Sequence, residues 1–141
     1  MPVRIRVKLT SIKSRKTIYS PALLNTGFTS EELDIHIPRD IALELGIWPP
    51  PKDSSLEILE TAGGETLSYS IPEAVELTVI EEDKVSKTIR CNVLVSLQEK
   101  EVLLSDAVIE ELEIEILSPK TGLWKFRDDT RIRKSISEDT K

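Results

Sequence analysis

One short segment combines residue types that could form a site. The apolar residues Ala22, Leu23 and Leu24 lead directly into Asn25-Thr26-Gly27. A polar group that follows a buried strand is held at a defined point, where it can contact a ligand. Asn and Gly both tolerate left-handed backbone, so the same three residues also fit an ordinary turn.

Other candidate residues have structural interpretations. His36 is the single histidine, which excludes a His-rich metal cluster, and it is expected in a loop. Cys91 is the single cysteine, and it is expected to be a buried, small hydrophobic residue. Asp106 is expected to stabilise the first turn of a helix through its charge. Trp48 and Trp124 are expected to anchor a core or an interface. One cysteine excludes a disulfide and a Cys-based zinc site, so we expect no metal or other cofactor.

The elements that position these residues are mostly short strands. Val3, Ile5, Val7 and Leu9 alternate with basic or polar residues, which predicts a half-buried strand. A polar turn at 11–16 and an extended run at 17–24 complete a predicted hairpin. Further strands are predicted at 56–59, 66–70, 75–80, 89–97, 102–104, 114–117 and 123–126.

Two short helices are also predicted. The first begins near Pro38, which lacks only an N–H that is free in a first turn, and ends at Gly46. The second begins after Ser105, a good N-cap residue, and includes Asp106. The fold class is therefore all-β with one or two short helices.

Composition limits the possible partners. The chain has 141 residues, 19 Lys+Arg and 25 Asp+Glu, giving a net charge of −6. We expect one domain over residues 1–127 and a polar, flexible tail over 128–141, which has little apolar surface to offset its ordering entropy. The acidic balance argues against nucleic acid, and no apolar run reaches the roughly 18 residues of a membrane span. A cytoplasmic protein is expected. The scarcity of Asn and Gln is typical of proteins from hot environments.

Residues 22–30 resemble the active-site segment of the retropepsin-like aspartic peptidases, where apolar strand residues run into Asp-Thr-Gly. Three further regions resemble that family in order and spacing. The helix ending at 43–47 is similar to its first helix, the hairpin around Ala62, Gly63 and Gly64 to its flap, and residues 103–112 to its second motif, in which a glycine precedes a helix. Residues 122–126 resemble the closing strand of small prokaryotic members. The resemblance covers residues 3–127.

The resemblance implies an acid-protease barrel that forms a homodimer, with a peptide or protein ligand in a cleft at the dimer interface. Family members use one Asp from each chain, and the two carboxyls share a proton. Here Asn25 stands at that position, while Thr26 and Gly27 are kept. Ser105 follows Leu104 where the family has glycine, and Glu113 replaces a common glycine after the helix.

These residues leave three hypotheses. An amide has no titratable proton, so the first is an inactive peptidase homologue that binds peptides as a dimer. The second is an active aspartic endopeptidase whose natural residue at position 25 is Asp, with Asn engineered or open to deamidation. The third is a plain β-barrel interaction subunit.

Overall fold

The computed structural model describes residues 2–52, 54–61 and 64–138, and gives the backbone alone for 57–61 and 64–66. Strands dominate, and two helices of six residues each accompany them, which confirms the predicted all-β class. The elements are β1 (Arg4–Ser11), β2 (Thr17–Leu24), β3 (Asp34–Pro38), α1 (Arg39–Glu44), β4 (Ser55–Thr61), β5 (Gly64–Val79), β6 (Ile89–Ser96), β7 (Val102–Leu104), α2 (Asp106–Glu111), β8 (Ile114–Ser118), β9 (Leu123–Phe126) and β10 (Arg133–Lys134).

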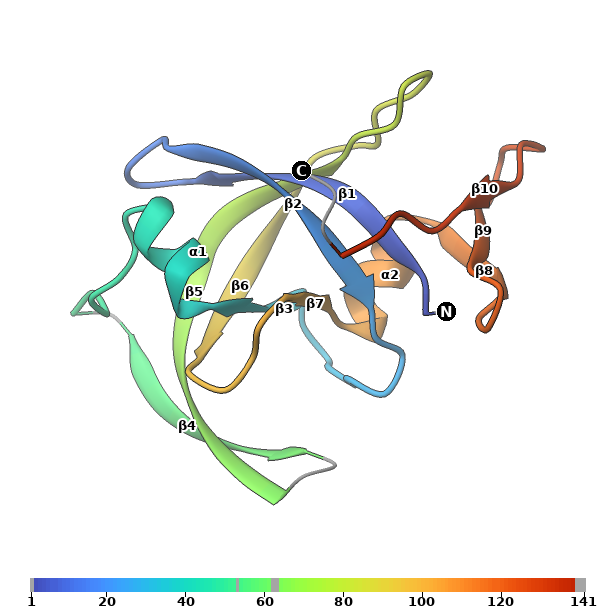
Figure 1. The fold of residues 1–141 in the computed structure, drawn as a ribbon. Helices are drawn as coiled ribbons and strands as arrows, with labels where there is room; N and C mark the ends of the chain where they lie inside the picture. The colour runs from blue at the N-terminus through green and yellow to red at the C-terminus, as the bar shows by residue number, and fades with distance from the viewer. Residues whose placement is uncertain (1, 53, 62–63, 139–141) are drawn as a thin grey trace.

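The main sheet closes into a barrel (Figure 1). Its strand order is β1-β2-β7-β3-β6-β5-β4, and β1 also pairs with β5, so six strands form the closed barrel and β4 lies outside it. The predicted alternation in β1 is confirmed, since Val7 and Leu9 are fully buried while their neighbours are partly exposed. Alternate side chains fill the interior because successive strand residues point to opposite faces.

β5 is a single strand of 16 residues where the sequence predicted two shorter ones. Its pairing register with β6 shifts between Ile71 and Val75, and Glu73 has a left-handed φ of 43° there. Such a bulge bends a strand without ending it. The first part of β5 therefore pairs with β4 in a hairpin that projects from the barrel, and the second part closes the barrel against β1 (Figure 1).

Both helices begin and end close to their predicted limits. Pro38 is the N-cap of α1, and Gly46 follows that helix with a φ of 74°. Ser105 caps α2 by accepting a hydrogen bond from the Val108 N–H at 3.4 Å. No helix in the described part of the chain is long and apolar enough to cross a membrane.

The segment after Arg127, where the sequence predicted a polar, flexible tail, includes the short strand β10. β10 joins β9 and β8 in a three-stranded sheet, and Arg133 is 4% exposed. The Arg133 guanidinium binds the carboxylates of Glu81, Asp83 and Asp129 at 2.7–3.0 Å and lies 5.3 Å from the centre of the Phe126 ring. Charge pairing and stacking hold this segment, which an argument from apolar surface alone does not reveal.

Candidate functional site

The predicted site residues Asn25 and Ser105 lie at the ends of two neighbouring strands. β2 and β7 are parallel, with Leu24 opposite Leu104. The Asn25 N–H donates to the Leu104 carbonyl at 3.1 Å, which extends this pairing one residue into the loop. The structure therefore brings together the two segments 25–27 and 104–105, which are far apart in the sequence.

Asn25 also forms the turn that follows. Its side-chain Oδ1 accepts a hydrogen bond from the Gly27 N–H at 3.1 Å, and its carbonyl accepts one from the Phe28 N–H at 3.0 Å. A Cβ added at Gly27 would lie 3.3 Å from that Oδ1, a close contact that glycine avoids. The amide oxygen of Asn25 is thus engaged in the loop, while Thr26 and Gly27 are exposed.

The start of α2 fixes the other end of this turn. The Asp106 N–H donates to the Phe28 carbonyl at 2.9 Å. The Asp106 carboxylate accepts hydrogen bonds from the N–H of Ser30 at 2.9 Å and of Ala107 at 2.7 Å. Asp106 therefore holds the loop against the helix, in agreement with its predicted place in the first turn.

A second carboxylate, Asp34, lies behind the loop in a network that the sequence did not indicate. The Ser30 hydroxyl donates a hydrogen bond to one oxygen of this carboxylate. The side-chain amide of Asn92 donates a hydrogen bond to the other oxygen at 3.0 Å. The Asn92 Oδ1 in turn accepts from the Glu73 N–H at 2.9 Å. The loop is thereby connected to the bulge in β5. Alternating polar residues on separate strands carry no sequence signal for this arrangement.

The expectation that His36 is a loop residue is wrong. It is the middle residue of β3 and is only 5% exposed. The Phe28 ring packs edge-on against the imidazole, with 4.7 Å between ring centres. Burial lowers the pKa of His36 to about 4, against a smaller opposite effect of Asp34, so the imidazole is neutral near pH 7. Isoleucines flank it on both sides, and this apolar context was the available signal for a strand.

The other predicted residues have mainly structural roles. Cys91 is fully buried, and burial raises the pKa of its thiol to about 12, which makes it a poor nucleophile. Trp124 lies in the core and is 1% exposed. Trp48 and Tyr69 pack against each other and against the core. In the described parts of the chain, no three His, Cys, Asp or Glu side chains are grouped to hold a metal.

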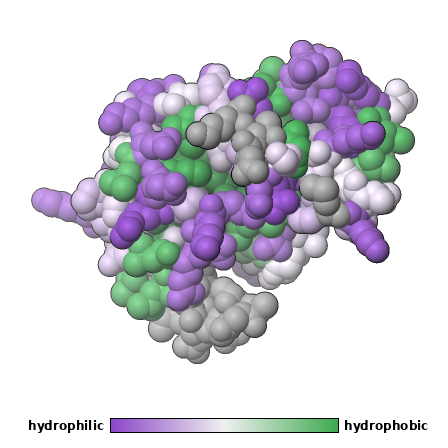
Figure 2. All heavy atoms as spheres, viewed as in Figure 1, coloured by the Kyte–Doolittle hydropathy of each residue, from purple (hydrophilic) through white to green (hydrophobic). Residues whose placement is uncertain are grey.

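β4 and β5 form a hairpin at the segment whose sequence resembles a flap. Thr61 pairs with Gly64, which begins β5, and Ala62 and Gly63 lie outside the described residues. In Figure 1 this hairpin and the loop after β2 both extend toward the bottom of the view. Leu56 and Leu67 on the hairpin are more than half exposed. On the face seen in Figure 2, hydrophobic residues form small groups among hydrophilic ones.

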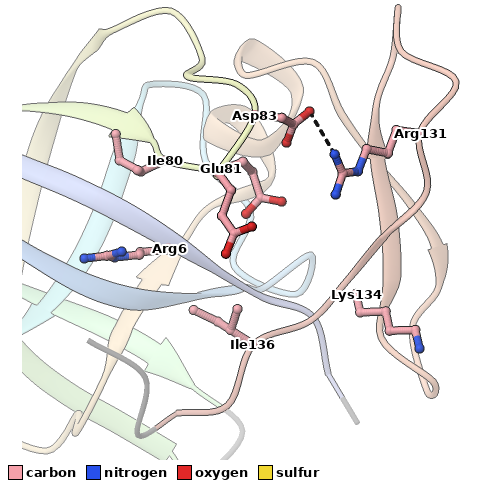
Figure 3. Close-up of a pocket in the computed structure, with 8 residues that line it drawn as sticks. Arg6, Ile80, Glu81, Asp83, Arg131, Lys134 and Ile136 are labelled. Carbon is pink, nitrogen blue, oxygen red and sulfur yellow. Dashed lines mark ion pairs between the residues drawn. The ribbon is translucent and has the colours of Figure 1, made fainter.

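Two cavities in the surface differ in character. One of about 490 Å³ lies directly beside the loop, and its lining is mainly apolar. Its walls are formed by Pro2, Val3, Leu24, Thr26, Ile116, Pro119 and Lys120. The other, of about 360 Å³, shares no lining residue with the loop and contains Glu81, Asp83 and Arg131 (Figure 3). There Arg131 is paired with Asp83 at 3.3 Å, so its charges largely neutralise one another.

Comparison with known proteins adds no relative. No model of a known protein family matches the chain, and no curated protein sequence matches it.

Proposed function

We propose that this chain is a retropepsin-like module that binds peptide or protein segments as a homodimer and does not cleave them. The observation that carries the proposal is the position of Asn25, at the end of β2 and hydrogen-bonded to the end of β7. A turn anchored by two strands and by the start of α2 presents its central residues rigidly to a ligand.

Lack of catalysis follows from the chemistry of the amide. Asn25 cannot accept a proton from water, and its Oδ1 is already engaged by Gly27. The carboxylates nearest in the hydrogen-bond network, Asp34 and Asp106, each accept two hydrogen bonds from other groups. Asp34 uses both of its oxygens in these hydrogen bonds, and Asp106 uses Oδ1 to hold the loop against α2, so both carboxylates serve the structure of the loop.

Peptide binding is supported by the hairpin. β4 ends the strand order of the main sheet, so its outer edge has backbone groups that lack a partner strand among the described residues. An extended peptide can add to such an edge through main-chain hydrogen bonds. The exposed Leu56 and Leu67 offer apolar contacts to its side chains.

The apolar cavity beside Thr26 supports the homodimer. A second copy of the chain that packs there would bring the two Asn25 loops together and would bury this exposed apolar surface. Two neutral amides at such an axis avoid the repulsion that two carboxylates would have.

The test combines sedimentation with peptide retention by the immobilised protein from a pool of random decapeptides. We expect a dimer that retains peptides, and we expect Thr26→Arg to abolish both properties. Val85→Arg, which adds the same charge at an exposed residue in the turn between β5 and β6, should change neither. A monomeric native protein that retains nothing would contradict the proposal and favour the plain β-barrel subunit.

A further inference from the structure

One row of side chains crosses four strands on the face opposite the main core. Leu103 of β7 lies between Leu23 of β2 and His36 of β3, and His36 lies opposite Leu94 of β6. Their strand neighbours, such as Ile35 and Ile37, are fully buried in the barrel, so these four side chains point the other way. We call Leu23, Leu103, His36 and Leu94 the outer row.

His36 is the anomalous member of the outer row. Both of its ring nitrogens are buried and have no hydrogen-bond partner among the described residues. A buried polar atom without a partner destabilises a folded protein, and an apolar side chain of similar volume would avoid that cost. Such a local violation is expected where a residue serves a ligand rather than the fold.

Phe28 is the group that connects His36 to the candidate site. Its ring packs on the imidazole, while its backbone belongs to the loop that carries Asn25. That backbone is held on both sides, by Asn25 and by Asp106. The half-buried ring can therefore rotate about its own side-chain bonds, which changes its contact with His36, while the backbone hydrogen bonds of the turn stay in place.

We propose that Phe28 and His36 form a recognition pair, in which a bound peptide displaces the Phe28 ring and places a hydroxyl or carboxamide against the imidazole. This inference rests on the proposed peptide-binding function and names the residue that gives it specificity. A neutral imidazole has one N–H donor and one acceptor nitrogen. Hydroxyl and carboxamide groups both donate and accept, so either tautomer of His36 can pair with them.

Peptide selection tests the recognition role. The native protein, His36→Leu and a control variant select from the same pool of random decapeptides, and the retained peptides are sequenced. The control is Cys91→Ala, a buried change on the core-facing side of β6. We expect the native protein and the control to enrich Ser, Thr, Asn or Gln at one position, and His36→Leu to lose this preference and bind those peptides about tenfold more weakly.

Equal preference and affinity in His36→Leu would overturn the inference but leave the proposed function intact. Failure of every variant to retain peptide would overturn the proposed function and the inference with it. The two failures are therefore distinguishable.

Chemical modification tests whether the Phe28 ring shields His36. His36 is the only histidine, so its reaction with diethyl pyrocarbonate can be followed by mass spectrometry at one site. We expect Phe28→Ala to raise the reaction rate at least tenfold, and Leu97→Ala, at an exposed residue between β6 and β7, to leave it unchanged. Retained peptides should slow the reaction in Phe28→Ala. An unchanged rate in Phe28→Ala would overturn the pairing of the two residues.

Discussion

The side-chain oxygen of Asn25 accepts a hydrogen bond from the backbone N–H of Gly27 at 3.1 Å, so the residue at the candidate site also builds its loop. A carboxylate has the same acceptor geometry as this amide oxygen. At protein concentrations low enough to keep the chain monomeric, where no second carboxylate faces it, we therefore expect Asn25→Asp to keep the free energy of unfolding at pH 7 within about 0.5 kcal/mol of the native value. Asn25→Val should lose about 1 kcal/mol because the Gly27 N–H loses its partner. Urea unfolding measures both, and an equal loss in the two variants would contradict this role.

Protonation of His36 should make the protein less stable in mild acid. Its pKa is 6.5 when unfolded and about 4 in the folded protein, so between these values the unfolded chain binds more protons. Stability is then fully present above pH 6.5 and falls as the pH drops toward 4, by about 3 kcal/mol at about 1.4 kcal/mol per pH unit. Urea unfolding as a function of pH measures this loss. His36→Leu should remove most of it, and an unchanged slope in that variant would assign the loss to other groups.

Arg133 should be important for the stability of the C-terminal segment. Its side chain is 3% exposed and binds three carboxylates, so Arg133→Met should lower the free energy of unfolding by about 2 kcal/mol. Arg131→Met is the matched control, because Arg131 is 59% exposed and, among the described residues, its guanidinium pairs with Asp83. We expect that control to cost less than about 0.5 kcal/mol. Equal effects in thermal unfolding would show that burial of Arg133 is unimportant.

The ion pairs of Arg133 should survive in the range where His36 titrates. Arg133 lowers the pKa of Asp83 to about 2, below its ordinary value of 3.8. A carboxylate with a lowered pKa stabilises the fold above pH 3.8 and loses this effect as the pH falls through 2. The difference in stability between native protein and Arg133→Met should therefore be constant from pH 7 to about pH 4. A difference that disappears by pH 5 would contradict this assignment.

Glu113 has a backbone conformation that suits glycine. It follows α2 with a left-handed φ of 58°, and its N–H donates to the Glu110 carbonyl at 2.9 Å. Glu113→Gly should raise the free energy of unfolding by about 1 kcal/mol because glycine adopts this φ without strain. Glu110→Gly, inside the helix, should lower it by a similar amount. Guanidinium unfolding that ranks the two variants in the opposite order would contradict this explanation.

Local patterns predicted those strands and helices in which the buried residues recur at the regular spacing of that type of secondary structure. The alternation in Val3–Leu9 identified β1, and Ser105 identified the start of α2, because strand pleating and capping depend on neighbouring residues. The pairing of Leu24 with Leu104 was not predicted. Neighbouring residues carry no information about which distant strands meet.

Features that depend on distant partners were missed. Arg133 lies in a polar segment, and only the positions of Glu81 and Asp83 show why it is buried. In this case tertiary contacts overrode the local preference. His36 was expected in a loop because of Pro38 and Asp34, although the isoleucines on either side of it were a local signal for the strand that buries it.

Peptide hydrolysis tests the central proposal most directly. The native protein and Asn25→Asp are incubated with pooled peptides at about pH 5.5, where most of the stability contributed by neutral His36 remains. We predict that only Asn25→Asp cleaves peptides, and that a transition-state-mimicking inhibitor of aspartic peptidases blocks the cleavage. Inhibitor-sensitive cleavage by the native protein would contradict the proposal that a chain with Asn25 is inactive. Absence of cleavage by both proteins would contradict the proposed cleft.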